Sequence, residues 1–530
     1  MEKLVIVIPA IKKNAVIPDQ LVKKLGGITL MQRAINTAKE LSNKIFIITD
    51  SEELSLIAER NKVNYYYDSK LKIDPDNIRN ELGTIIINNI NEKADILLYR
   101  ANTPLVTKDI LKDAYEKYKN LNKKYILLST TKSLRKVFIK ENDVKFIDKF
   151  PPKKIMEEIK SFQIFPMQAL KSDDYMFSFY QLPYEKAVEI ESYQDWWVCE
   201  KLLERKKIIF NVIGSQKIGM GHIYRSLTLA HEINDHEIIF ACNKRYSFAV
   251  KQIASTDYKV ISYKNEKELL SLKPDLIIND VLNTKKEYIQ SIKNKNIKVL
   301  NFEDLGDGAE FADYTINELY EKPLIKGNNF LWGSDYFFLR DEFDNAKPNS
   351  FSKKVKKILI TFGGTDQNNL TLLTLESILP IVKKHNININ IVCGGGYLHK
   401  EKLELFVNQI SEIEINVYYA TEVISKIMEN TDIAICSNGR TVYELADMNI
   451  PSIVISHHNR ENGHSFANLE KGFVNLGVIN NKTSKKIKDT FNKLVTDIDY
   501  RYLLYLNILK YSFRNNKTKI IKLINELLNY

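Results

Sequence analysis

Runs of consecutive apolar residues that end in a glycine- or serine-rich turn and lead into a helical pattern recur along this chain. Strands that are apolar on both faces are typical of a parallel sheet covered by helices, and ligands of such sheets bind beyond the carboxyl ends of the strands. Three runs, at 357–361, 387–392 and 433–436, end in the loops Phe362-Gly363-Gly364-Thr365-Asp366, Cys393-Gly394-Gly395-Gly396 and Ser437-Asn438-Gly439-Arg440-Thr441. The repetition predicts an α/β fold with one anion-binding crevice lined by these loops.

An earlier apolar run, 207–213, leads into Ile218-Gly219-Met220-Gly221-His222-Ile223-Tyr224-Arg225. Gly219 and Gly221 allow a tight turn and let a ligand approach bare backbone. The apolar spacing that follows predicts a helix with His222 in its first turn, where free amides and the helix dipole favour an anion. An imidazole at that place suits a phosphate-bearing substrate, although such a histidine could also cap the helix or satisfy a buried backbone group.

The length of the chain, 530 residues, is too great for one hydrophobic core. Strand and helix patterns alternate over 1–205, with strands expected at 4–8, 44–49 and 96–99 and a helix at 79–90. A second set occupies 206–345, and a third occupies 346–530 after a polar break at 343–352 that contains Pro348. These boundaries predict three α/β domains, each built on a parallel sheet.

The composition excludes several functional classes. The formal charge of +11 comes from 77 basic against 66 acidic residues, but the lysines are interleaved with acids, which argues against a nucleic-acid stripe and suits small anionic substrates. The four cysteines lie far apart and are expected to be reduced thiols of a cytoplasmic protein. No apolar run approaches 18 residues and no leader pattern precedes residue 4, so we expect neither a membrane span nor a signal peptide.

The first 200 residues resemble the cytidylyltransferases that activate nonulosonic acids, such as sialic, pseudaminic and legionaminic acid, as CMP-sugars. The segments that carry the resemblance are Ile8-Pro9-Ala10, Ile17-Pro18, Lys24-Leu25-Gly26-Gly27, Thr49-Asp50-Ser51, Asn102-Thr103-Pro104-Leu105 and Ile190-Glu191-Ser192-Tyr193-Gln194-Asp195-Trp196-Trp197. The resemblance implies a nucleotidyltransferase-type domain, with CTP and a nonulosonic acid as partners and Mg²⁺ needed only if the domain is active.

The departures from that family lie in the nucleotide loop. Ile11 stands where the family has arginine, Lys12-Lys13-Asn14-Ala15 replaces a glycine-rich cradle, and Arg100-Ala101 replaces Gln-Pro. Without glycines the backbone cannot wrap a triphosphate closely, and lysines supply charge without the geometry of arginine. A degenerate or retuned site at Pro9, Ala10, Lys12, Lys13 and Asn102 is one interpretation. The other is a scaffold that docks or forms a homodimer, for which residues 140–188 offer an extended hairpin or dimer contact.

Residues 207–480 resemble the UDP-sugar hydrolase of pseudaminic acid biosynthesis and its spore-coat relatives, which have the two-lobed GT-B fold. The segments that carry this resemblance are Gly219-Met220-Gly221-His222 with Arg225, Asn279-Asp280, Glu303-Asp304, 335–343, Gly363-Gly364-Thr365-Asp366 and 437–444. The peptidoglycan N-acetylglucosamine transferase shares the fold and a similar glycine-histidine loop, so the motifs do not separate hydrolase from transferase. By analogy with this fold, the helical tail at 484–530 is expected to cross back onto the first of its two sheets.

The resemblance implies a role for each of several residues. His222 would activate water, the amides after Gly363 and Gly439 would hold the diphosphate, and Glu444 would accept the ribose hydroxyls. Tyr224 and Arg225 would face the sugar, although Arg225 could instead pair with a carboxylate such as Asp304. The full predicted substrate site is Gly219, Gly221, Tyr224, Arg225, Asp304, Gly363, Gly364, Thr365, Ser437, Gly439, Arg440, Thr441, Glu444 and Asn462.

Two further features concern the same site. Arg440 stands in a loop where the hydrolases have a Gly-Gly-Ser-Thr-like sequence, so it adds charge near the phosphates or the sugar. His457 and His458 are adjacent, point apart on a strand end, and are interpreted as a polar loop; we expect no metal site, and the hydrolase family needs no cofactor.

The sequence therefore predicts a hydrolase that cleaves a UDP-linked diacetamido-trideoxy sugar into sugar and UDP, fused to a divergent cytidylyltransferase-like domain. A UDP-sugar glycosyltransferase, a bifunctional enzyme with an active CMP-sugar synthetase, and a non-catalytic scaffold remain the alternatives.

Overall fold

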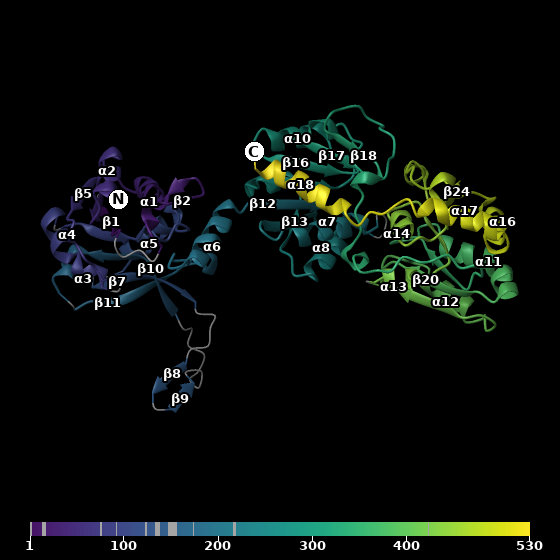
Figure 1. The fold of residues 1–530 in the computed structure, drawn as a ribbon, viewed down its shortest axis with the longest axis horizontal. Helices are drawn as coiled ribbons and strands as arrows, with labels where there is room; N and C mark the ends of the chain where they lie inside the picture. Colours follow the sequence, from purple (N-terminus) through teal and green to yellow (C-terminus); the bar gives the residue numbers. More distant parts are fainter. Residues whose placement is uncertain are drawn as a thin grey trace. The chain divides into compact units, whose positions relative to one another are not determined.

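The computed structural model describes residues 3–12, 17–74, 77–91, 93–121, 124–132, 138–141, 143–146, 156–172, 174–215, 219–421 and 423–529. The chain forms two compact units, Met1–Arg205 and Lys206–Tyr530, and is α/β throughout (Figure 1). The predicted site residue Lys13 lies outside the described residues, as do Asn14, Ala15 and Ile218 of the two predicted loops.

The first unit is built on one seven-stranded sheet in the order β11-β7-β10-β6-β1-β4-β5. Its strands are β1 Leu4–Ala10, β4 Ile45–Thr49, β5 Asn64–Tyr67, β6 Asp95–Tyr99, β7 Tyr125–Lys132, β10 Met156–Pro166 and β11 Met176–Gln181. The expectation of an all-parallel sheet is wrong for β10, which runs antiparallel to both β6 and β7. The short strands are β2 Lys24–Leu25 with β3 Ile28–Thr29, and β8 Phe138–Glu141 with β9 Asp143–Phe146, which form an antiparallel pair within the segment expected to be a hairpin.

The helices of this unit are α1 Leu30–Lys39, α2 Glu52–Arg60, α3 Ile78–Glu81, α4 Gly83–Asn89, α5 Lys108–Lys119 and α6 Tyr193–Glu204. The single helix expected over 79–90 is thus two helices, which meet at Leu82. α6 begins with a capping box, in which Asp195 accepts from the backbone and the hydroxyl of Ser192.

The second unit begins with a seven-stranded, all-parallel sheet in the order β14-β13-β12-β15-β16-β17-β18. The strands are β12 Lys207–Val212, β13 Glu237–Asn243, β14 Val260–Tyr263, β15 Leu276–Asp280, β16 Lys298–Phe302, β17 Tyr314–Asn317 and β18 Phe330–Trp332. The helices are α7 Gly221–Glu232, α8 Ser247–Ala254, α9 Lys267–Ser271 and α10 Lys286–Lys293. We refer to this part as the first lobe.

The second lobe carries a six-stranded parallel sheet in the order β21-β20-β19-β22-β23-β24. Its strands are β19 Lys357–Thr361, β20 Asn388–Cys393, β21 Ile415–Tyr419, β22 Ile433–Ser437, β23 Ser452–Ser456 and β24 Phe473–Val478. Its helices are α11 Leu370–His385, α12 Lys400–Val407, α13 Ser425–Met428, α14 Thr441–Asp447, α15 Asn459–Asn462, α16 Thr483–Thr496 and α17 Ile498–Ile508. The loops after β20, β19 and β22 leave the same edge of neighbouring strands, as the sequence predicts.

The last helix, α18 Asn516–Leu528, leaves the second lobe and packs on the first, where Figure 1 shows it in yellow beside α7. Ile520, Ile524 and Leu527 are buried in one hydrophobic cluster with Phe210 of β12 and Phe240 of β13. The expected crossing back of the tail is confirmed. Two parallel sheets joined by a linker and tied by a returning helix make up the GT-B arrangement.

A row of asparagines fixes the strands of the first lobe relative to one another. Asn211, Asn279 and Asn301 are paired across β12, β15 and β16, and all three are buried. The amide of Asn211 donates to Asn279 at 3.0 Å, and the amide of Asn279 donates to Asn301 at 2.9 Å. Because buried amides need partners, this row favours a single register near the carboxyl ends of the strands.

The docking of α18 can be tested by a truncation in its buried face. We expect Ile524→Ala to lower the free energy of unfolding by about 2–5 kcal/mol, because the side chain is fully buried and its removal leaves a cavity in the first lobe. The exposed Lys522→Ala on the same helix is the control, with an expected change within about 0.5 kcal/mol. Equal effects of the two substitutions in chemical denaturation would show that α18 is not docked.

Candidate active site

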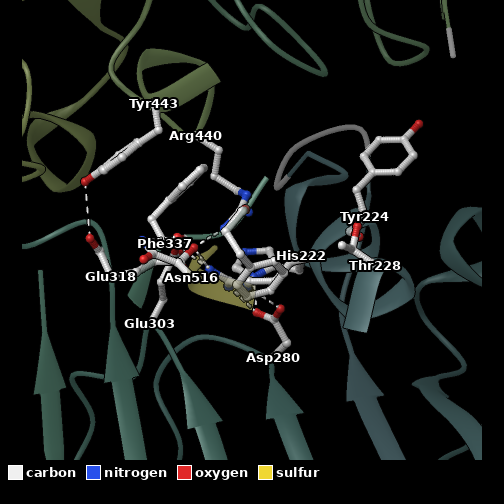
Figure 2. A network of polar contacts seen from close by, with 12 residues as sticks. His222, Tyr224, Thr228, Asp280, Glu303, Glu318, Phe337, Arg440, Tyr443 and Asn516 are labelled. Atoms are coloured by element: carbon white, nitrogen blue, oxygen red, sulfur yellow. Dashed lines mark hydrogen bonds and ion pairs between the residues drawn. The ribbon is translucent and has the colours of Figure 1, made fainter. Parts of the chain in front are cut away.

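Three buried carboxylates at the ends of adjacent strands converge on one arginine. Asp280 ends β15, Glu303 follows β16 and Glu318 follows β17. Arg225 of α7 donates through Nε to Asp280 at 2.8 Å, and its Nη1 lies 2.8 Å from both Glu303 and Glu318. Figure 2 shows the three carboxylates beyond the carboxyl ends of the strands, on the side where His222 lies. We call these four residues the carboxylate cluster.

The alternative prediction, that Arg225 pairs with a carboxylate, is confirmed, because its guanidinium is enclosed by these three carboxylates and its side chain is only 1% exposed. Asp304, the carboxylate named as an example in that prediction, is not one of the three partners. Its carboxylate accepts hydrogen bonds from the backbone and hydroxyl of Thr284 and from the amide of Asn301, and it is fully buried. Asp304 therefore shapes a turn of the first lobe and does not reach a ligand.

His222 occupies the first turn of α7, as predicted, and its ring is held from one side. Its Nδ1 lies 2.5 Å from Oδ1 of Asp280, and the same oxygen lies 2.6 Å from Nη2 of Arg225. A carboxylate on Nδ1 fixes that nitrogen as the donor and leaves Nε2 as the atom that can take a proton. The pair has the geometry of a general base with an orienting acid.

The charges of the cluster set its protonation. Burial would raise the pKa of Asp280, yet Arg225 and His222 hold it far below its usual range. Burial likewise opposes the same two charges at Glu303, whose pKa falls to about 2. The pKa of Glu318 is instead raised by burial, which Arg440 and Arg225 only partly offset. Asp280 is therefore ionised, whereas Glu318 is the carboxyl of the cluster that most readily holds a proton.

Two neighbouring cavities lie between the lobes, and we call the set of residues that line both of them the waist. One, of about 340 Å³, is lined by His222, Arg225 and Glu303 together with residues of the second lobe. The other, of about 230 Å³, is lined by Tyr224, Arg340 and Glu444 together with the loops after β20 and β22. Six residues line both cavities: Gly221, Gly363, Gly364, Ser437, Gly439 and Arg440. The waist is therefore lined by backbone, one hydroxyl and one guanidinium.

The smaller cavity brings a buried carboxylate against a guanidinium. Glu444 lies in the first turn of α14, is buried, and accepts from Nε of Arg340 at 3.0 Å. Thr441 lines the same cavity. Tyr224, expected to face the sugar, lines this cavity and is not among the residues of the His222 cavity. The sequence missed Arg340, although its segment was among those carrying the resemblance.

The larger cavity is lined on the second-lobe side by His457, His458, Arg460, His464 and Thr365, and on the first-lobe side by Gly219 as well as His222. His457 and His458 lie in the loop between β23 and α15, as interpreted from the sequence, and both side chains line the cavity. His458 caps α15 by accepting from the amide of Glu461, which turns the loop toward the first lobe. Asn462, expected to touch the sugar, is exposed and lines neither cavity.

In the predicted site of the first unit, basic side chains are paired with carboxylates of the same unit. Pro9 and Ala10 end β1, and the ammonium of Lys12 lies 2.8 Å from Glu53 and 3.1 Å from Asp19. Asn102 donates to Glu189 at 3.2 Å. Arg100, at the end of β6, pairs with the same Glu189 at 2.8 Å. The basic groups that would meet a triphosphate thus hold carboxylates of the chain itself.

Comparison with known proteins identifies a family match within the second lobe. Residues 358–505 match the family model described as glycosyltransferase family 28 C-terminal domain. A UDP-2,4-diacetamido-2,4,6-trideoxy-beta-L-altropyranose hydrolase of Campylobacter jejuni is 28% identical over 251 residues, which cover 45% of this chain and 87% of the relative. The chain is similar to a UDP-sugar hydrolase.

Two longer relatives extend the comparison. A Helicobacter pylori protein named as pseudaminic acid cytidylyltransferase and hydrolase of the same UDP-sugar is 24% identical over 228 residues, 42% of this chain and 40% of the relative. An uncharacterised Methanocaldococcus jannaschii protein is 31% identical over 270 residues, 47% of this chain and 55% of the relative. The matches thus span about half of these two proteins. They confirm the resemblances to both families.

The described residues contain neither a membrane-spanning helix nor a metal-binding cluster. Within that part of the chain, none of the helices combines the length and apolar character that a bilayer crossing requires. Over the same residues, no group of three His, Cys, Asp or Glu side chains is arranged to hold a metal ion.

The depressed pKa of Glu303 predicts how stability depends on pH. Its carboxylate is ionised more easily in the folded than in the unfolded chain, so it stabilises the fold above about pH 4.5 and this stabilisation is lost as the pH falls toward 2. Between pH 6 and pH 3 the loss from this group is about 2 kcal/mol. We expect Glu303→Gln to reduce the difference between denaturation free energies at these pH values. The exposed Glu310→Gln should keep the wild-type difference, and an unchanged difference in Glu303→Gln would contradict the assignment.

Proposed function

We propose that the second unit hydrolyses a UDP-linked diacetamido-trideoxy sugar, releasing the free sugar and UDP. The observation that carries the proposal is the His222–Asp280 pair at the wall of the larger cavity. The smaller cavity next to it shares the waist residues and could hold the nucleoside. Support for the sugar comes from the names of the Campylobacter and Helicobacter relatives.

In this mechanism His222 acts as the general base. Nε2 takes a proton from a water molecule in the larger cavity, and the water oxygen attacks the anomeric carbon of the sugar. The bond from that carbon to the diphosphate oxygen breaks, and its electron pair leaves with UDP. Asp280 stays ionised because Arg225 and His222 depress its pKa, so it stabilises the imidazolium that forms.

UDP is a good leaving group, so the reaction needs stabilised diphosphate charge more than a strong acid. The waist supplies backbone amides at Gly363, Gly364 and Gly439, the hydroxyl of Ser437 and the guanidinium of Arg440. On the nucleoside side, Glu444 would accept the ribose hydroxyls while Arg340 holds its carboxylate in place. We propose that this reaction proceeds without a metal or another cofactor.

The proposal is tested by phosphorus NMR with UDP-2,4-diacetamido-2,4,6-trideoxy-altrose, in chelator and without an acceptor. We expect release of free UDP by the wild type. His222→Asn should lower turnover by about 10²- to 10⁴-fold because the base is lost, while UDP affinity in calorimetry stays unchanged. The exposed His231→Asn on the same helix is the control and should turn over like the wild type. An intact substrate with wild-type protein would favour a transferase or another sugar, and full turnover by His222→Asn would refute the mechanism.

For the first unit we propose a divergent cytidylyltransferase-like domain with weak or no CTP-dependent activity. The pairing of Lys12 with Asp19 and Glu53, and of Arg100 with Glu189, supports this proposal, since these charges are already neutralised. We expect no CMP-sugar from CTP, Mg²⁺ and pseudaminic, legionaminic or sialic acid in a pyrophosphate-release assay. Rapid pyrophosphate release with any of these acids would show a working synthetase.

A further inference from the structure

Arg440 is the only charged residue among the six that line both cavities. It precedes α14 in the second lobe, and its side chain passes the start of α7, where Cδ would lie 3.8 Å from a side chain at Gly221. Any group that joins a nucleoside in one cavity to a sugar in the other must pass this guanidinium. Under the proposed function that group is a diphosphate.

In the structure described here, Arg440 is bound to the opposite lobe. Its Nη1 contacts Oε1 of Glu318, its Nη2 donates to the carbonyl of Phe338 at 2.8 Å, and its guanidinium lies 4.3 Å from the ring centre of Phe337. Figure 2 shows Arg440 reaching from α14 toward the carboxylate cluster. The pair therefore crosses the waist and lies where the diphosphate would.

Glu318 is an unusual partner, because two guanidinium groups share one of its oxygens. Oε1 lies 2.8 Å from Nη1 of Arg225 and also accepts from Arg440. Oε2 is buried and has no hydrogen-bond partner among the described residues. A carboxylate that shares one oxygen and leaves the other unused holds each arginine less firmly than a bidentate pair would. Arg225 keeps Asp280 and Glu303 in any case, so Arg440 is the partner that can leave.

The carboxylate cluster tolerates that departure. Around Glu318 lie Arg225 and, beyond it, His222, Asp280 and Glu303, with the hydroxyl of Tyr443 donating to the Glu318 carbonyl. Once Arg440 has left, Arg225 still contacts Glu318. Burial already raises the pKa of Glu318, so the carboxyl can take a proton from solvent and leaves no unpaired charge.

We propose that Arg440 exchanges Glu318 for the diphosphate of the bound nucleotide, and that Glu318 holds the guanidinium across the waist until the nucleotide arrives. This inference rests on the proposed function for the nature of the ligand. Under this proposal Arg440 binds the diphosphate, and Glu318 is the residue that positions Arg440 before the nucleotide binds. A dianionic diphosphate offers several oxygens to the planar fork of arginine, which a shared carboxylate oxygen does not.

The test compares the binding of UDP and of uridine by calorimetry in the full chain. Arg440→Ser should weaken UDP binding by about 10- to 100-fold, the loss expected for charge-assisted hydrogen bonds, and should leave uridine affinity unchanged. Arg440→Lys keeps the charge without the fork, so its UDP affinity should lie between those of the wild type and the serine variant. Glu318→Gln should bind UDP about three- to tenfold more tightly than the wild type, because Arg440 no longer has to leave a carboxylate.

The outcomes separate this inference from the proposed function. Wild-type protein that binds neither UDP nor uridine would overturn both. Wild-type binding of UDP with unchanged affinity in Arg440→Ser, or with equal losses for UDP and uridine, would overturn only the exchange. Weaker UDP binding in Glu318→Gln, at unchanged uridine affinity, would also overturn it, because the pair would then be needed intact. Uridine affinity shows in each variant that the nucleoside cavity is still folded.

Discussion

The buried ion cluster around Arg225 is the interaction on which the site depends. An arginine that is 1% exposed must have its charge met inside the fold, and Asp280, Glu303 and Glu318 meet it from three adjacent strands. Removing one partner of such a pair generally costs about 3–5 kcal/mol, because the other charge is left buried. The cluster also keeps Asp280 ionised, and Asp280 orients His222. The orientation of His222 thus depends on an arginine that pairs with the same carboxylate.

The waist between the lobes depends on glycine for a different reason. A side chain at Gly364 would come within 3.4 Å of Gly219, and one at Gly394 would meet Gly364 at 2.4 Å. The loops after β19 and β20 can therefore approach each other, and the loop after β19 can approach the first lobe, only through bare backbone. This close approach brings two cavities together and leaves Arg440 as the one long side chain in the passage. The proposed exchange of its partners would therefore take place at the waist.

In the first unit, too, charged side chains lie at the carboxyl ends of strands, but they are not grouped around one buried arginine. Lys12 and Arg100 lie at the carboxyl ends of β1 and β6, where a parallel sheet offers its ligand site. Both are paired with carboxylates of the chain, which suits a fold retained without the original chemistry. The missing glycines of the nucleotide loop are the feature by which the sequence predicts a divergent site there. The sequence did not reveal the antiparallel β10, since strand direction depends on connections that apolar runs do not encode.

The sequence by itself determined the alternation of strands and helices in the second unit, the edge at which its loops meet, and the place of His222 at the start of α7. These features are local, because apolar runs, glycines and helix starts act within a few residues. Only the tertiary structure decided which acids meet Arg225. Glu303 and Asp304 are neighbours in sequence, yet one reaches the arginine and the other turns to Thr284. The order of strands in the sheet and the turn at each strand end choose between them, and neither is written in a short stretch of sequence.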